Sequence, residues 1–229
     1  MRYVVTGANR GIGLELVRQL ASRGDEVEAV VRDPAGAGEL ERLAARTPAQ
    51  VRVHACDVAS DSSVNALARS IGPVPVDVLI NNAGVMGRML SLEELDLEDA
   101  MHTFDVNALG PVRVVRAMLP SLLKSEVRRV VHITSGMGSI ADNTSGGAYG
   151  YRMSKAALNM ANKSMSVDLA SRRFTCVVIN PGWVQTDMGG AGAPTPVAES
   201  VSKMLAIVDG LSPSQTGTFF DYKGGTFPY

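Results

Sequence analysis

The chain has 229 residues, of which 45% are hydrophobic and 20% charged, and its formal net charge is −1. This length and composition are typical of a globular protein with a substantial core. The near-neutral charge provides no global field for nucleic acid, and no apolar run is long enough to span a bilayer. We therefore expect no nucleic-acid partner, no membrane partner and no secretory signal. The two cysteines, Cys56 and Cys176, lie in apolar runs, as reduced thiols of a cytoplasmic protein do.

Strand and helix patterns alternate along the whole chain, which indicates a parallel sheet covered on both faces. Apolar runs predict seven strands, at Tyr3–Thr6, Val27–Val31, Val51–Ala55, Val76–Ile80, Arg129–Thr134, Thr175–Asn180 and Thr218–Tyr222. Helical periodicity predicts helices near residues 11–23, 37–46, 60–71, 97–124, 149–171 and 195–211. The predicted fold is α/β: a single-domain Rossmann fold with a doubly wound seven-stranded parallel sheet. No repeat or linker divides it, so we expect residues 1–229 to form one dinucleotide-binding and catalytic domain.

A glycine-rich turn stands between the first predicted strand and the first helix. Gly7, Gly11 and Gly13 follow the strand, with three residues and then one residue between them. Glycines let the backbone approach a pyrophosphate closely, and the helix N-terminus offers N–H groups to the anion. A turn without a ligand is the alternative, but the strand–turn–helix context favours a nucleotide site. Its predicted residues are Gly7, Asn9, Arg10, Gly11, Ile12 and Gly13.

The end of the second strand bears on the choice of cofactor. We place that end at Val31, which is not an acid, and Arg32 follows it directly. Together with Arg10, Arg32 can clamp a phosphate through charge-assisted contacts, which favours NADP(H). NAD(H) stays possible, because Asp33 becomes the ribose-binding acid if the strand end is misplaced by one residue.

Two further segments follow predicted strands, where ligands bind in an open parallel sheet. Asp57 is placed to accept a hydrogen bond from the adenine amino group, although an acid at a helix N-terminus is an equal alternative. The segment after the fourth strand supplies a tight turn beside the cofactor, or one that only stabilises the sheet. The residues that we predict to contact the cofactor here are Asp57, Val58, Asn82, Ala83 and Gly84.

Three residues carry a pattern suited to carbonyl and alcohol chemistry. Tyr151 and Lys155 lie one helical turn apart, and Ser135 follows the fifth strand. The reaction needs a proton donor for the oxygen that becomes an alkoxide, but a free tyrosine has a pKa near 10. A nearby Lys⁺ and an oxidised nicotinamide are expected to lower that pKa. Ser135 is expected to hydrogen-bond the substrate oxygen. Tyr149 lacks a lysine four residues on, so we interpret it as a pocket wall or as simple packing.

Five motifs stand in the order and spacing of one family: Thr6–Gly13, Asn81–Gly84, Ser135, Tyr151-x-x-x-Lys155 and Pro181-Gly182. The chain resembles the short-chain dehydrogenase/reductase family over almost its whole length. The resemblance implies that Tyr151 is the general acid/base, that Ser135 orients the substrate and that Lys155 binds the nicotinamide ribose. It also implies that Asn107 holds a water of the proton relay. Further cofactor contacts implied by the family are Asn82, Tyr151, Lys155, Pro181, Gly182, Val184 and Thr186.

A narrower resemblance concerns residues 154–160 and 181–190, which are similar to the C-factor/sniffer-like branch. Members of that branch are cytosolic and include NADPH-dependent carbonyl reductases. The resemblance implies a cytoplasmic reductase of a small aldehyde or ketone. Two alternatives stay open: an NADP(H)-binding signalling or sensor protein with little catalysis, because the branch includes signalling factors, and an NAD-dependent alcohol dehydrogenase, because of Asp33.

Two features bear on partners other than the substrate. The predicted helices at 97–124 and 149–171 are long and carry many small and apolar residues. In the resembling family the equivalent helices often pair across a dimer axis, so we expect a homodimer or homotetramer. The three histidines, His54, His102 and His132, show no metal-ligand spacing, and we predict no metal site.

Overall fold

A parallel sheet of seven strands, in the order β3-β2-β1-β4-β5-β6-β7, organises residues 1–229, all of which the computed structural model describes. Every pairing between neighbouring strands is parallel. The strands are β1 (Arg2–Thr6), β2 (Glu26–Val31), β3 (Val51–Ala55), β4 (Val78–Asn81), β5 (Arg129–Ile133), β6 (Thr175–Asn180) and β7 (Phe219–Asp221). The order reverses between β1 and β4, so the carboxyl ends of these two strands open a crevice.

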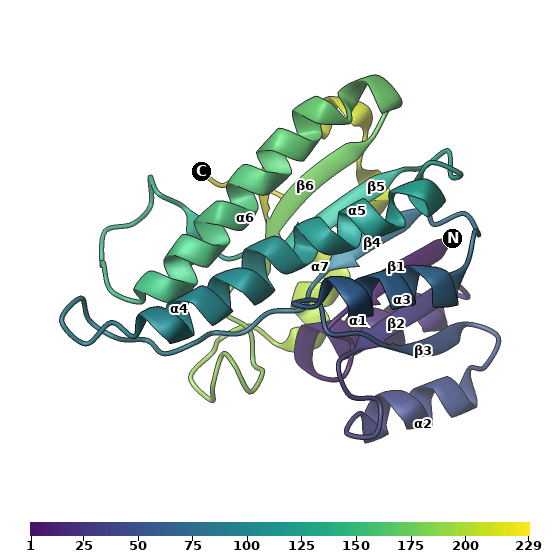
Figure 1. The fold of residues 1–229 in the computed structure, drawn as a ribbon, viewed down its shortest axis with the longest axis horizontal. Coiled ribbons are helices and arrows are strands. Elements are labelled where there is room, and N and C mark those ends of the chain that lie inside the picture. The colour runs from purple at the N-terminus through teal and green to yellow at the C-terminus, as the bar shows by residue number, and fades with distance from the viewer.

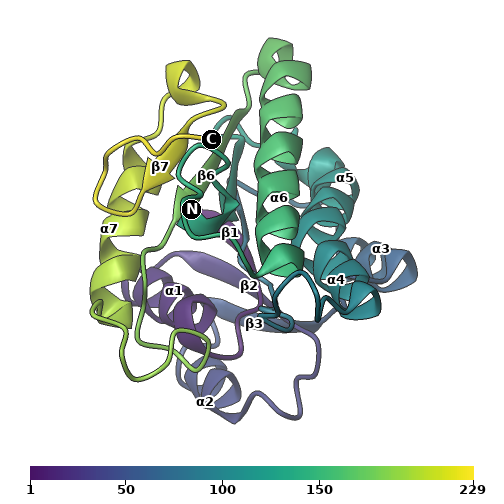
Figure 2. The same cartoon turned by 90° about the vertical axis from the view of Figure 1, so that its left-hand side faces the viewer.

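Helices cover both faces of the sheet (Figures 1 and 2). One face carries α1 (Gly11–Ser22), α2 (Gly38–Arg46) and α7 (Val197–Gly210). The other carries α3 (Asp61–Ile71), α4 (Leu97–Phe104), α5 (Gly110–Leu122) and α6 (Tyr149–Asp168). Burial on both faces explains why the strands read as nearly continuous apolar runs. The predicted doubly wound α/β fold is confirmed. None of the helices combines the length and apolarity that crossing a bilayer requires.

The predicted elements are present, with some ends displaced. The strand that we expected to begin at Val76 begins at Val78, and the helix expected to reach residue 171 ends at Asp168, before a 3-10 turn at Ala170–Arg172. The continuous helix predicted for residues 97–124 is wrong in its middle, because a π-turn at Asp105–Leu109 separates α4 from α5. The cause lies in the sequence. Pro111 has no N–H and cannot donate to the Asn107 carbonyl as an α-helix requires.

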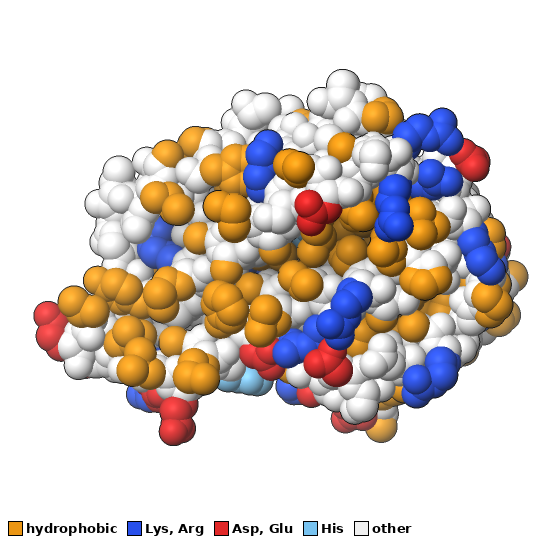
Figure 3. Space-filling view, turned by 45° about the horizontal axis from the view of Figure 1, so that its top comes forward, with side chains coloured by type: hydrophobic (Ala, Val, Ile, Leu, Met, Phe, Trp, Pro, Cys, Tyr) orange, Lys and Arg blue, Asp and Glu red, His pale blue; other side chains and the backbone are white.

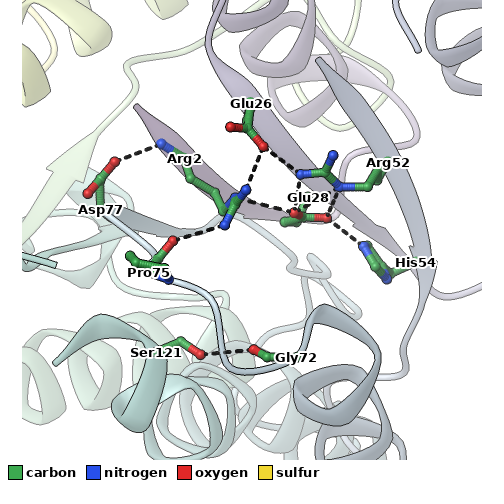
Figure 4. A network of polar contacts seen from close by, with 9 residues as sticks. All are labelled: Arg2, Glu26, Glu28, Arg52, His54, Gly72, Pro75, Asp77 and Ser121. Atoms are coloured by element: carbon green, nitrogen blue, oxygen red, sulfur yellow. Dashed lines mark hydrogen bonds and ion pairs between the residues drawn. The ribbon is translucent and has the colours of Figure 1, made fainter. Parts of the chain in front are cut away.

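A charged network crosses β1, β2 and β3 on one face of the sheet (Figure 4). Strand register places Arg52 opposite Glu28, and the guanidinium donates to both Glu28 carboxylate oxygens at 2.8–3.2 Å. His54 Nε2 lies 2.7 Å from the same carboxylate, and its Nδ1 lies 3.0 Å from Ser70 Oγ on α3. Glu28 is almost fully buried. A charge placed inside the sheet is therefore held by partners from its neighbouring strand.

The network sets the protonation of Glu28. Burial acts to raise the pKa of this carboxyl, but hydrogen bonds from His54 and Arg52 outweigh it and lower the pKa below the ordinary value of 4.5. A lowered folded-state pKa stabilises the fold at every pH above 4.5, and this stabilisation is lost as pH falls through the folded-state value. Glu28 therefore favours the folded state at neutral pH and contributes to acid unfolding.

We predict that Glu28→Gln lowers the free energy of unfolding by about 1–3 kcal/mol at pH 7, because Arg52 and His54 lose their charged acceptor. Glu26→Gln is the matched control, since Glu26 also pairs with Arg52 but its side chain is 42% exposed, and its expected effect is below about 1 kcal/mol. Urea unfolding at pH 7 and pH 4 measures both. Equal losses for the two variants, or a Glu28→Gln deficit that does not shrink at pH 4, contradict the account.

Candidate active site

A cleft of about 820 Å³ lies at the carboxyl ends of β1 and β4, where the strand order reverses. Its size is within the range of ligand-binding clefts. The loops after β1, β2, β3, β4 and β6 line it together with the first turns of α1 and α6. The cleft therefore gathers, from segments far apart in sequence, most of the residues that the sequence predicts for the cofactor.

The backbone of the glycine-rich turn after β1 carries no side chain at Gly7, Gly11 and Gly13. A Cβ on Gly13 would lie 2.1 Å from the Gly7 carbonyl oxygen, and Gly7 has a φ of +67°, which favours glycine. Asn82 Nδ2 donates to the carbonyls of Thr6 and Gly7 at 3.0 and 3.1 Å, which ties the turn to the loop after β4. The N-terminus of α1 opens directly on the cleft. This uncovered turn fits a pyrophosphate, because backbone N–H groups and the positive end of the α1 dipole are available to an anion there.

The loop after β2 presents both an arginine, Arg32, and an acid, Asp33, to the cleft. β2 ends at Val31, as expected, and the exposed Arg32 follows it. Asp33 Oδ1 accepts the Ala35 N–H at 3.0 Å, so this carboxylate caps its own turn. Arg10 also lines the cleft, but its guanidinium forms an ion pair with Asp187 at 2.7 Å, across the cleft mouth. Both guanidiniums that the sequence singles out therefore border the cleft.

The loop after β3 lies beside this region. Asp57 stands two residues beyond β3, and its Oδ1 accepts the Ala59 N–H at 3.0 Å. Asp57 and the buried Val58 both line the cleft. The carboxylate thus serves its own turn with one oxygen and leaves the other available to a ligand.

Tyr151 and Lys155 line the cleft, and Ser135 lies beside Tyr151 but outside the lining. Tyr151 and Lys155 lie in the first turns of α6, and Ser135 lies just after β5. The Ser135 hydroxyl lies near enough to the Tyr151 phenol to act on its pKa, and its Oγ accepts the Met137 N–H at 3.1 Å. Lys155 is only 5% exposed, and its Nζ donates to the Ile133 carbonyl at 3.0 Å. The structure brings together the three residues that the sequence grouped.

Burial controls the ionisation of this group. Burial raises the pKa of the Tyr151 phenol above 10.0, and the hydrogen bond with Ser135 opposes the rise. The expected lowering of this pKa by Lys155 is not met by the protein alone, because the Lys155 hydrogen bond goes to Ile133 and its Nζ lies 5.8 Å from the tyrosine ring centroid. Burial also lowers the pKa of Lys155 to about 8, so the amine is still largely charged at pH 7. A lowered tyrosine pKa requires a further positive charge in the cleft.

Asn107 lies behind the cleft, in the π-turn, and is fully buried. Its Oδ1 accepts the Val85 N–H and its Nδ2 donates to the Val85 carbonyl, both at 2.8 Å. Nδ2 also donates to Ser154 Oγ on α6 at 3.0 Å. The side chain therefore fastens the loop after β4 to α6, while Pro111 leaves the backbone carbonyl without its α-helical donor.

Sequence reasoning missed the residues that press the Ser135 turn against α6. A Cβ on Gly138 would lie 2.8 Å from Lys155 Cβ, so the turn packs directly on the helix. Asn159, one turn beyond Lys155, donates to the Gly138 carbonyl and accepts from Thr134 Oγ1 at 3.1 and 2.7 Å. The position of Thr134 next to Ser135 was the available signal, since a polar residue at the end of a buried strand needs a partner.

The segment after β6 closes the cleft on the side of the predicted nicotinamide. Pro181 and Thr186 line the cleft, and Thr186 lies against Gly11 of the glycine-rich turn. Gly182 and Val184 lie outside the lining: Gly182 packs on the Tyr222 ring, and the buried Val184 pairs with Thr195. The other residues predicted to contact the cofactor all line the cleft: Gly7, Asn9, Arg10, Gly11, Ile12, Gly13, Arg32, Asp57, Val58, Asn82, Ala83, Gly84, Tyr151 and Lys155.

Comparison with known proteins agrees with this geometry. Residues 2–195 match the family model described as short chain dehydrogenase. The chain is 55% identical to C-signal of Myxococcus xanthus over 166 residues, which cover 72% of this chain and all of that protein. An NADPH-bound carbonyl reductase from chicken fatty liver superposes with a TM-score of 0.94 at 34% identity, over 100% of this chain and 98% of that one. The carbonyl reductase Sniffer of D. melanogaster gives 0.95 at 32%, over 100% and 99%.

We predict that Gly13→Ala weakens NADPH binding by about tenfold to a hundredfold, because the new methyl group collides with the Gly7 carbonyl and displaces the turn. Gly210→Ala is the control, since nothing lies within 4 Å of a Cβ at Gly210. Titration by nicotinamide fluorescence measures both dissociation constants, and circular dichroism verifies the folds. Wild-type affinity in folded Gly13→Ala contradicts the assignment of this turn.

Proposed function

We propose, from the premise that this chain belongs to the short-chain dehydrogenase family, that it is an NADPH-dependent reductase of a small aldehyde or ketone. The observation that carries the proposal is that Tyr151 and the buried Lys155 line the cleft together, with Ser135 near enough to the Tyr151 phenol to lower its pKa. A bare glycine turn for the phosphates and a proton donor for the reacting oxygen lie in one cleft. The carbonyl reductases with the same fold support this choice.

The proposed mechanism uses the protein groups as follows. NADPH, when bound, supplies the hydride to the carbonyl carbon. Ser135 donates a hydrogen bond to the substrate oxygen, and Tyr151 protonates that oxygen as negative charge develops on it. The Lys155 ammonium stabilises the resulting phenolate and hydrogen-bonds the nicotinamide ribose. The Asn107 carbonyl holds a water through which Tyr151 regains its proton.

The arginines at the proposed adenine end of the cleft favour NADP(H) over NAD(H). Arg32 follows β2 at the cleft edge, where it can pair with a 2′-phosphate, and Arg10 borders the same cleft. Asp33 also borders the cleft and has one carboxylate oxygen outside its own turn, so it is the residue that would hold a ribose hydroxyl if the cofactor were NAD(H). We propose Asp57 and Val58 as the adenine contacts and Pro181, Gly182, Val184 and Thr186 as the nicotinamide-side segment.

Tyr151→Phe is expected to reduce the turnover number about 10²-fold to 10⁴-fold, because the proton donor is lost while the ring remains. Tyr149→Phe loses the same hydroxyl two residues away and is expected to keep near-wild-type turnover. The loss of NADPH absorbance with aldehydes, diketones and quinones measures both. Full activity in Tyr151→Phe rules out this mechanism.

Arg32→Ala is expected to raise the KM for NADPH about tenfold to a hundredfold through loss of a charge-assisted phosphate contact, with the KM for NADH unchanged. Arg46→Ala, which removes an exposed charge from α2 outside the cleft, should affect neither constant. A wild-type preference for NADH would instead support an NAD-dependent alcohol dehydrogenase.

A second candidate function is NADP(H)-dependent signalling with little catalysis, which the 55% identity to a protein named C-signal favours. The complete Ser135, Tyr151 and Lys155 group argues against it, because a sensor does not need a proton donor. Rescue of a deletion phenotype by Tyr151→Phe, with intact cofactor binding, would favour signalling over reduction.

We also propose that residues 1–229 act as one domain in the cytoplasm, and that two copies pair through α4 and α6. The free, buried thiols of Cys56 and Cys176 support a reducing compartment. α4 packs against α6, and Figure 3 shows hydrophobic side chains gathered on the face that they present. The exposed large hydrophobic residues of α4 and α6 are Leu97, Met101, Phe104, Met153, Met160 and Val167, and Leu109 at the end of the π-turn is also exposed. Such a face is self-complementary across a two-fold axis, and a homotetramer would need a second interface.

Met160→Asp is expected to convert the dimer to a monomer, because it buries an unpaired charge in the proposed interface. Ile140→Asp, at an exposed residue outside α4 and α6, serves as the control. Sedimentation velocity distinguishes the species. A wild-type monomer would contradict the pairing without affecting the proposed reaction.

A further inference from the structure

The Asn180 side chain, at the end of β6, joins two loops of the candidate site. Its Oδ1 accepts the Gly136 N–H at 3.1 Å and the Gly182 N–H at 3.2 Å. Gly136 directly follows Ser135, and Gly182 lies in the segment proposed to hold the nicotinamide. One oxygen atom therefore fixes the spacing between the residue that orients the substrate and the nicotinamide side of the cleft.

Asp221, at the end of β7, determines which way the Asn180 amide points. The β6–β7 register places these residues opposite each other, and Asn180 Nδ2 donates to Asp221 Oδ2 at 3.0 Å. The other carboxylate oxygen accepts the Lys223 N–H at 3.0 Å. A carboxylate only accepts and backbone N–H groups only donate, so the amide has one orientation that satisfies every partner.

Close packing prevents either loop from compensating for a change at Asn180. A Cβ on Gly136 would lie 3.1 Å from Phe227 Cζ, so the Ser135 turn is backed by the segment after β7. Gly182 has a φ of +80°, and a Cβ there would lie 2.6 Å from the Tyr222 ring. Both loops thus rest on the segment that contains Asp221, and the hydrogen bonds of Asn180 set their separation.

We propose that Asn180 and Asp221 are positioning residues for the reduction: Asp221 orients the Asn180 amide, and Asn180 holds Ser135 in register with the nicotinamide side. The proposal rests on the proposed function and names no contact between these residues and the reacting atoms. Their effect passes through Ser135 and Gly182. Displacements of about 1 Å at a reacting centre reduce rates by about a hundredfold, so small shifts in this spacing matter.

The test exchanges the two polar groups. N180D places a carboxylate against that of Asp221, whereas the double variant N180D/D221N lets the new amide at position 221 donate to the new carboxylate at position 180. The double variant can thus keep the hydrogen bonds from the Gly136, Gly182 and Lys223 N–H groups and restore the bond between positions 180 and 221 with donor and acceptor exchanged. We expect N180D to lower kcat about tenfold to a hundredfold, and the double variant to recover to within about threefold of wild type. The KM for NADPH should change less than about threefold in both, because the glycine turn and Arg32 are untouched.

The fluorescence of Trp183 reports on the segment after β6 independently of turnover. Trp183 is the only tryptophan of the chain, it directly follows Gly182, and its side chain is 59% exposed. N180D is expected to change its emission maximum and its quenching by acrylamide, and N180D/D221N to restore both. D142N is the control, because it makes the same change of carboxylate to amide at an exposed residue with no contact to Asn180.

The outcomes are separable from those of the proposed function. Loss in N180D with recovery in the double variant, in both kcat and Trp183 emission, supports the inference. A double variant as impaired as N180D, or an N180D variant with wild-type kcat and emission, overturns it. If the wild type reduces no carbonyl, the Trp183 comparison still decides whether Asn180 and Asp221 position the segment, and only the proposed reaction fails.

Discussion

The site depends on keeping the charged Lys155 amine inside the protein beside a tyrosine. An ammonium group is costly to remove from water, and burial here lowers the pKa of Lys155 to about 8. Its neighbours meet this constraint by being small or by accepting a hydrogen bond. Gly138 allows the Ser135 turn to press on Lys155, Gly84 leaves space beside the Nζ atom, and the Ile133 carbonyl accepts a hydrogen bond from it. Burial and the charge of Lys155 lower the pKa of His132 to about 3, so that ring stays neutral.

The buried charge of Lys155 also bears on the asparagine side chains that hydrogen-bond the loops around the cleft. Asn107, Asn159 and Asn180 each use one amide to connect two loops or a loop to a helix. A buried amide satisfies backbone groups that a turn would otherwise leave unpaired, and it does so without adding charge next to Lys155. The result is a set of loops at strand ends that are joined to one another and to α6 by hydrogen bonds. Loops held in this way suit the orientation of a carbonyl group that the proposed function requires.

Much of the fold and part of the site follow from the sequence for identifiable reasons. Parallel strands are buried on both faces, so their apolar runs are readable, and the Tyr151–Lys155 spacing places both side chains on one face of a helix. The roles of Asn180 and Asp221 are not readable, because they depend on the register between β6 and β7. The π-turn at Asn107 can be predicted from Pro111, which lacks the N–H that an α-helix needs at that position. Helical periodicity alone does not reveal it. The effect of Lys155 on Tyr151 depends on which acceptor Lys155 finds, which only the tertiary structure specifies.

The most direct test of the central claim follows the transferred hydrogen. NADPH that carries deuterium at nicotinamide C4, on each face in turn, is supplied with a reactive aldehyde or ketone, and the product is analysed by mass spectrometry. The account predicts an alcohol with one deuterium on the former carbonyl carbon from one face only. An alcohol without deuterium from both labelled cofactors, or no alcohol from any carbonyl despite tight NADPH binding, contradicts the claim that this cleft reduces carbonyl groups.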